Sequence, residues 1–335
     1  MNINSLSIFD PSSNSRCQII HSMASGLPPP MGVDYWVTDA VNDETATSSQ
    51  RLCLETNTLR AEVTRLLTAN TRGPDVNEKI AVLLKRMQAT DAAAVEWFHT
   101  IPEHWRSVTI AWEDHVPDGD FARAEVYPGR VDVYRDFWIA SVVNMVRVSR
   151  IALQSTIVRC VAWICAPADY RTTPEYAAAL RVCTELITDI IASVPYHLGW
   201  HLKRPEALRR ANLSGFGCGD ETASKSLPGY FLNMPLVAVQ NMDCCTDSQR
   251  TWVRGRLRYV ASELGIRYSG VLAKVSFLLC LPPILLRSET PAKPNMNSLK
   301  FVSPRCISAA TTSSQNPTQS LTILRRPSRR RQRTP

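Results

Sequence analysis

Apolar side chains recur every three or four positions along most of this 335-residue chain, which is the spacing of a buried helix face. One such face begins at Leu52 and ends at Leu67. The same spacing predicts further helices at 74–87, 90–102, 133–163, 174–194, 247–264 and 267–281. The apolar stretch 228–240 is predicted to be a short buried helical turn that Pro235 interrupts.

Particular residues indicate where several of these helices begin and end. N-cap side chains accept a hydrogen bond from a free backbone N–H group of the first turn, and the candidates here are Thr90 or Asp91, Thr173 and Asp247. Pro195 is expected to close the helix that begins after Thr173. Gly265 is placed to end a later helix, because glycine readily adopts the left-handed conformation found there.

These patterns predict an all-α fold, an irregular multi-helix bundle formed by one domain from 46 to 284. Residues 1–45 are rich in Ser, Pro and Asn and are expected to form a flexible lead. Residues 285–335 are expected to be a disordered tail, because ordering costs roughly 1–2 kcal/mol per residue and this composition buries little apolar surface. The stretch between 102 and 133 is expected to be a loop.

The segment "VYRDFWIASVVNMVRVSRIALQ", residues 133–154, combines a broad apolar face with one polar stripe. At 100° per residue, its polar side chains fall within roughly a third of the circumference. The stripe consists of Asp136, Asn144, Arg147, Arg150 and Gln154. We expect the first four to pair with neighbouring helices and fix the register of the bundle. The alternative is that the stripe faces a ligand or a partner protein, for which the bidentate guanidinium of arginine is well suited.

The net charge of +8 belongs to the end of the chain. Six arginines lie within the last eleven residues: Arg325, Arg326, Arg329, Arg330, Arg331 and Arg333. Removing these six from the 38 basic residues leaves 32, against 30 acidic residues, so the body is nearly neutral. We therefore expect the body alone to have no specific affinity for nucleic acid. The arginine run is a candidate nuclear import signal or a nonspecific phosphate contact.

The ten cysteines form no C-x-x-C pair, so we expect neither a metal site nor a disulfide framework, and a reducing intracellular compartment. His197 and His201 are four apart without a third ligand nearby. No spacing assembles a catalytic constellation, so the sequence predicts no enzyme and no cofactor, and it leaves a small-molecule effector unknown. The apolar stretch 270–286 is interrupted by Lys274 and Pro282, and no membrane partner is expected.

Three segments together resemble the C-terminal helical regulatory region of the fungal zinc-cluster transcription factors, whose binuclear cluster is held by six cysteines. "VYRDFWIASVVNMVRVSRI" is similar to a family helix with an aromatic-Asp-aromatic start, an Asn and an Arg-x-x-Arg. "IASVPYHLG" and "PGYFLNMPLVAVQNM", the latter followed by "WVRGRLRYVASELGIRYSGVLA", resemble its later helices. The order and spacing also fit, and the resemblance covers residues 75–280.

The sequence departs from that family because it has no six-cysteine zinc cluster. The resemblance therefore implies a regulatory-type helical domain without its own DNA-binding cluster. It also implies a nuclear location, other regulators or a second copy as partners, and a role in specialised-metabolism gene control. The alternative is a cytosolic helical scaffold for protein interactions with no transcriptional role.

Overall fold

The structure, a computed structural model, describes residues 18–37 except 24 and 31, and then 43–69, 72–204, 206 and 226–274. The chain divides into two units, Met1–Arg287 and Ser288–Pro335, and every described residue belongs to the first. The second unit, which includes nearly all of the expected tail and its six arginines, lies outside the described residues. The same is true of residues 207–225 and of the predicted helix beyond Lys274.

The expected all-α class is confirmed for the described residues, which are mostly helical and carry one small two-stranded sheet. The helices are α2 (Val33–Trp36), α3 (Glu44–Ala69), α4 (Pro74–Thr100), α5 (Phe137–Cys165), α6 (Pro174–His197), α8 (Ser226–Gln240), α9 (Asp247–Ser262) and α10 (Arg267–Leu272). The strands are β1 (Val108–Glu113) and β2 (Gly129–Val133). Short 3₁₀ turns occupy Glu103–Trp105, Pro117–Gly119, Tyr170–Thr172 and Trp200–Lys203.

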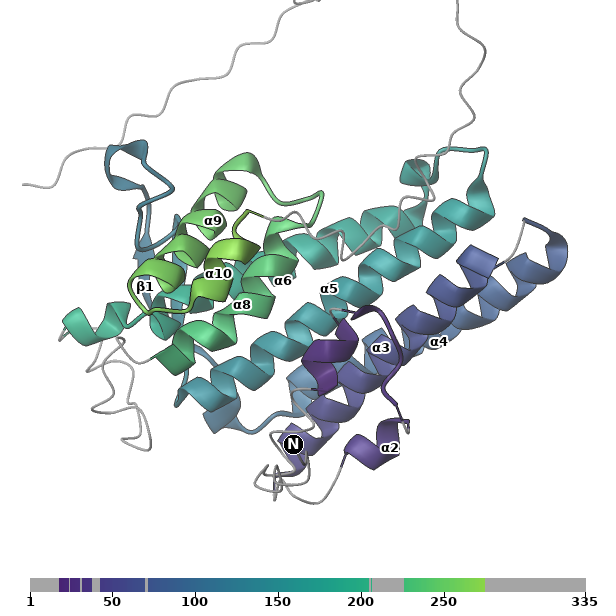
Figure 1. The fold of residues 1–335 in the computed structure, drawn as a ribbon, viewed down its shortest axis with the longest axis horizontal. Helices are drawn as coiled ribbons and strands as arrows, with labels where there is room; N and C mark the ends of the chain where they lie inside the picture. Colours follow the sequence, from purple (N-terminus) through teal and green to yellow (C-terminus); the bar gives the residue numbers. More distant parts are fainter. Residues whose placement is uncertain are drawn as a thin grey trace, which may run out of the picture. The chain divides into compact units, whose positions relative to one another are not determined.

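Helix α5 forms the centre of this unit, because it contacts α3, α4, α6 and α8 and most of its residues are buried. Figure 1 shows the α3–α4 hairpin along one side of α5, and α8, α9 and α10 gathered near the start of α5. The apolar core accordingly has two parts. A large cluster surrounds the first half of α5, and a smaller one joins its second half to α3 and α4.

Several helix ends follow the capping rules read from the sequence. The Thr173 side chain accepts a hydrogen bond from the Tyr176 N–H group, as expected for the N-cap of α6. Gly265 has a φ of 73°, the left-handed conformation expected beyond the end of α9. The N-cap of α9 is Thr246 rather than Asp247, because Thr246 and Gln249 form a reciprocal capping box.

Three predicted helix breaks are wrong. Helix α4 runs without interruption through Thr90 and Asp91, so neither residue is a cap. Pro195 lies inside the last turn of α6, and Pro235 lies inside α8. A proline removes one backbone donor, and each of these helices continues because its other turns are held by packing against the core.

The stretch between 102 and 133, predicted to be a loop, contains the antiparallel hairpin β1–β2. Val108 pairs with Val133 and Glu113 with Gly129, and the register shifts between Thr109 and Ala111. The local pattern is weak because β1 is buried only at Ile110, whereas Val131, Asp132 and Val133 of β2 are all buried. β2 lies against α6, so contact with that helix supplies the burial that a two-stranded sheet needs.

The segment that connects β1 to β2 lies on α9. The Trp252 indole donates to the Ala124 carbonyl at 3.1 Å, and Arg256 donates to the Arg123 carbonyl at 2.9 Å. Between them stands Gly255, where a Cβ atom would lie 2.0 Å from the Ala122 carbonyl oxygen. Glycine at 255 therefore allows the backbone of the connection to approach α9 closely.

Residues 1–45 were expected to form a flexible lead, but two short segments of them are helical. Residues 33–36 form α2, and residues 18–23 are helical, with Ile19 and Met23 buried against the core. The Asn57 side chain in α3 donates to the Ile19 carbonyl at 3.3 Å. Ile19 and Met23 are four residues apart, so they form one apolar helix face that packs against the core. The average composition of residues 1–45 does not reveal this face, because most of those residues are polar, proline or glycine.

Candidate functional site, a buried polar network between β2, α5 and α6

The four expected stripe residues occupy three different environments. Asp136 is the N-cap of α5 and accepts a hydrogen bond from its own helix, from the Ile139 N–H group at 2.8 Å. Asn144 and Arg147 are buried, with 1% and 5% of their surface exposed. Arg150 is nearer the surface and faces α4. The structure thus brings Asn144 and Arg147 together and places Asp136 and Arg150 elsewhere.

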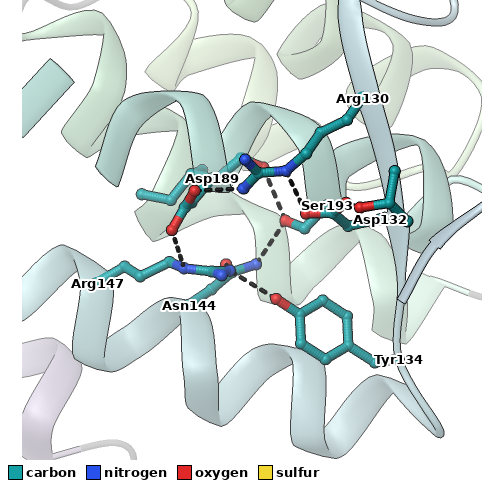
Figure 2. Close-up of polar contacts among 9 residues, drawn as sticks. Arg130, Asp132, Tyr134, Asn144, Arg147, Asp189 and Ser193 are labelled. Atoms are coloured by element: carbon teal, nitrogen blue, oxygen red, sulfur yellow. Dashed lines mark hydrogen bonds and ion pairs between the residues drawn. The ribbon is translucent and has the colours of Figure 1, made fainter. Parts of the chain in front are cut away.

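Arg147 is the centre of a polar network that Figure 2 shows between the three elements. One Nη of Arg147 donates to the Tyr134 hydroxyl at 2.6 Å and to the Asn144 Oδ1 atom at 2.9 Å. Its Nε lies 3.5 Å from the Oδ2 atom of Asp189 in α6. Arg130 of β2 pairs with the same Asp189 carboxylate, so two guanidinium groups share it.

Hydrogen bonds extend this network in two directions. Arg130 also pairs with Asp132 at 2.8 Å, and the other oxygen of Asp132 accepts from the Thr109 hydroxyl of β1 at 2.7 Å. On the other side, the Asn144 amide donates to the Ser193 hydroxyl of α6 at 2.9 Å. The network therefore runs from β1 through β2 and α5 to α6.

The charges of the network balance within it, because two arginines face two aspartates. Burial by itself lowers the pKa of Arg147, but Tyr134 and Asp189 outweigh burial and hold that pKa above its usual value. Burial likewise opposes the charge of Arg130, and Asp132 and Asp189 together raise the pKa of Arg130. Both guanidinium groups are therefore charged and paired, and what the arrangement does is hold β2, α5 and α6 in one register.

Further polar contacts join α5 to the α3–α4 hairpin. The Arg150 fork meets both carboxylate oxygens of Asp91 in α4, at 2.8 and 3.3 Å. The Arg159 guanidinium lies 3.5 Å from the Thr64 hydroxyl of α3. Gln154, the last stripe residue, is 7% exposed. The polar side chains of α5 thus contact a different neighbour at each level of the helix.

Sequence reasoning missed most of the residues that complete the network. The sequence patterns did not identify the partners of the α5 stripe, which are Tyr134, Asp189 and Ser193. They also assigned Arg130 and Asp132 to the loop expected between residues 102 and 133. One usable pattern existed, because Asp189 and Ser193 are four residues apart on α6 and so lie on one helix face. Their partner on α5 could not be read from α6 alone.

His197 and His201 are buried beside the network, at 0% and 2% exposure. The His197 Nε2 atom lies 3.5 Å from the Asn144 amide nitrogen, and the ring stacks on Phe137. Burial, and to a lesser degree His201, lowers the pKa of His197 to about 3, and burial lowers the pKa of His201 to about 4. Both imidazoles are therefore neutral at pH 7.

Among the described residues, no group of three or more His, Cys, Asp or Glu side chains could hold a metal ion. The six described cysteines are free thiols. These residues do not fit a zinc cluster. Helix α5 is long and apolar enough to cross a membrane by length and composition, but 61% of its most apolar window is buried inside the protein. That burial is typical of the core helix of a bundle.

Comparison with known proteins identifies a fungal transcription factor as similar to this chain. The match is to "Transcription factor dbaG" of Emericella nidulans, with 26% identity over 210 residues. It covers 62% of this chain and 47% of dbaG, so the chain spans about half the length of the curated relative that it matches. No family model matches the chain. No solved structure matches it.

The buried network predicts that Arg147→Ala lowers the free energy of unfolding by about 3–5 kcal/mol, because Asp189 loses one of two partners and Asn144 and Tyr134 lose a buried donor. Arg51→Ala is the matched control. Arg51 pairs with Asp34 on the surface, so its loss should cost about 0–1 kcal/mol. Urea unfolding of both variants measures the difference. Equal stability losses would contradict a structural role for the network.

The buried histidines predict that stability falls as the pH is lowered below about 6.5. An unfolded histidine takes up a proton near pH 6.5, whereas folded His197 has a pKa of about 3, so between these values acid favours the unfolded chain. Lowering the pH from 7 to 5 should therefore cost about 2 kcal/mol through His197. The free energy of unfolding measured across that range tests this.

His197→Gln should make the dependence of unfolding free energy on pH shallower by about 1.4 kcal/mol per unit between pH 6 and 4. His104→Gln makes the same chemical change at an exposed position and should leave the free energy of unfolding unchanged. An unaltered slope in His197→Gln would show that another group causes the acid sensitivity.

Proposed function

We propose that this chain is a transcription regulator whose helical body acts through contacts with other proteins, either other regulators or a second copy. The observation that carries the proposal is the similarity to a fungal transcription factor over 210 residues. It is supported by the three segments that resemble the helical regulatory region of zinc-cluster factors, all of which fall within or beside α5, α6, α8 and α9. Control of specialised-metabolism genes is the role that the resemblance suggests.

In this proposal the helical body has no zinc cluster and no sequence-specific affinity for nucleic acid. In its support, the chain outside the six terminal arginines is nearly neutral, and the arginines of the network are paired with acids inside the fold. We propose a nuclear location, with the run from Arg325 to Arg333 as import signal. That run lies outside the described residues.

A cytosolic interaction scaffold is the second candidate. The observation that favours it is the coverage of the match, because the aligned region is 47% of the relative and more than half of that transcription factor lies outside it. The two candidates differ in where the chain is found and in whether it changes transcription when brought to a promoter.

Fusing the full chain to an unrelated sequence-specific DNA-binding domain should change the transcription of a reporter that carries the site of that domain. The reason is that a regulator acting by protein contacts needs only to be placed at the promoter. The DNA-binding domain alone is the control, and the fusion carrying Arg147→Ala should lose the effect if the folded body makes the contacts. Reporter levels equal to those of the control would favour the scaffold.

A fluorescent fusion of the full chain should concentrate in the nucleus, and changing Arg329, Arg330 and Arg331 together to alanine should release it into the cytosol. Import signals of this kind are short runs of Lys or Arg, so the triple change to lysine is the matched control and should keep the protein nuclear. Microscopy of the three fusions gives the result. An even or cytosolic distribution of the unchanged chain would contradict the nuclear assignment.

A further inference from the structure

A short helical segment ahead of the long helices lies in a groove of the core. This segment, called the lead helix here, consists of residues 18–23, and Figure 1 draws it in purple beside α3. Ile19 and Met23 are 4% and 2% exposed, and both belong to the large apolar cluster around α5. Ser22 is 1% exposed. The lead helix therefore presents two large apolar residues and one small residue to the groove.

Two polar side chains of α3 hold the main chain of the lead helix. The Asn57 amide donates to the Ile19 carbonyl at 3.3 Å, and the Arg60 guanidinium donates to the Met23 carbonyl at 3.5 Å. Both α3 side chains are buried, with 1% and 8% of their surface exposed. Because both contacts are made to main-chain oxygens, they require a helix in this place and not a particular set of side chains.

The lead helix does not fill the groove completely. A cavity of about 20 Å³ remains where Met23 meets the core. It is lined by residues of the lead helix, α3, α5 and α8, namely Met23, Arg60, Val148, Ile151, Ala152, Met234 and Ala238. Methionine side chains are flexible and adapt to different neighbours, which is why they are common at surfaces that bind several partners. With Met23 removed, Met234 and the small alanines leave room for a different apolar side chain.

The chain between the lead helix and α3 is attached at the surface of the body. Asp34 of α2 pairs with Arg51 of α3, and these side chains are 87% and 47% exposed. Such a surface ion pair adds little stability. Leu27, just beyond the lead helix, is 59% exposed. The lead helix can therefore leave its groove without breaking a strong contact of the residues that follow it.

We propose that the groove between α3, α5 and α8 is a docking site for an amphipathic helix of a partner protein, and that the lead helix occupies it as an intramolecular competitor. Helices that bind in grooves are recognised by apolar anchors three or four positions apart. The partner helix carries a large apolar residue, a small residue three positions later and a second large apolar residue at the next position. This is the pattern of Ile19, Ser22 and Met23.

The existence of a partner rests on the function proposed above, whereas the occupation of the groove by the lead helix does not. The groove is open to a partner only while the lead helix is out of it, so the apparent affinity for a partner helix is lowered by the fraction of chains that are closed. The tests use a peptide of this chain and no promoter. They can therefore fail while the reporter and localisation experiments succeed, and the reverse.

A fluorescent peptide of residues 18–28 is the probe, because it brings the contacts of the lead helix itself. Fluorescence anisotropy measures its binding to the full chain with Ile19→Asp and Met23→Asp, two charges that an apolar groove excludes. This double variant should bind the peptide about ten times more tightly than the unchanged chain, whose groove is filled. No binding to the double variant, or equal binding to both chains, would overturn the proposal. A double variant that does not fold would overturn it too, because the lead helix would then be an indispensable part of the core.

Two controls show where the peptide binds. A peptide with the same two aspartates should bind neither chain. Adding Ala152→Trp to the double variant puts a large ring at the cavity and should abolish binding of the unchanged peptide. Ala92→Trp, at an exposed position of α4, is the matched substitution and should leave binding unaltered. Binding that persists with Ala152→Trp would show that the peptide attaches elsewhere and would refute the groove as its site.

Thiol labelling tests whether the lead helix leaves a folded body. Ser22→Cys replaces one oxygen by sulfur at a position that iodoacetamide reaches only when the lead helix opens. Local opening is more frequent than global unfolding, so this thiol should react about ten times faster than Cys53, a 1% exposed thiol of α3. Ser25→Cys, at an exposed position, is the control and should react fastest. Equal rates at positions 22 and 53 would show that the segment opens only with the whole body, and would overturn the proposal.

Discussion

The structure depends on the burial of a charged side chain, Arg147, in the middle of its central helix. A buried guanidinium is tolerated only when its charge is paired, and here Asp189 pairs with it while the Tyr134 hydroxyl and the Asn144 amide oxygen accept from one Nη. These partners come from α6, from the residue that follows β2, and from α5 itself. Satisfying this one group therefore fixes how three elements approach one another.

The small hairpin follows from the same constraint. Asp189 faces two guanidinium groups, and the second is brought by Arg130 of β2, which is itself paired with Asp132. β2 must therefore lie along α6, and β1 is paired to β2 beyond it. The connection between the strands then crosses α9 at Gly255, where a larger residue would meet backbone. A chain of contacts thus runs from α5 to α9 through a sheet of two strands.

Local features of the sequence predicted the helices well, and long-range partners poorly. Thr173 and Gly265 were read correctly because a cap depends on neighbours within a few residues. Asp91 was read as a cap, yet its carboxylate pairs with Arg150 on another helix. The helical period of 3.6 residues was enough to show that the polar residues of α5 lie along one stripe. It could not show that one of them caps α5, another contacts α6 and another contacts α4, because those contacts depend on how the helices pack together. β1 was missed because only Ile110 is buried in it.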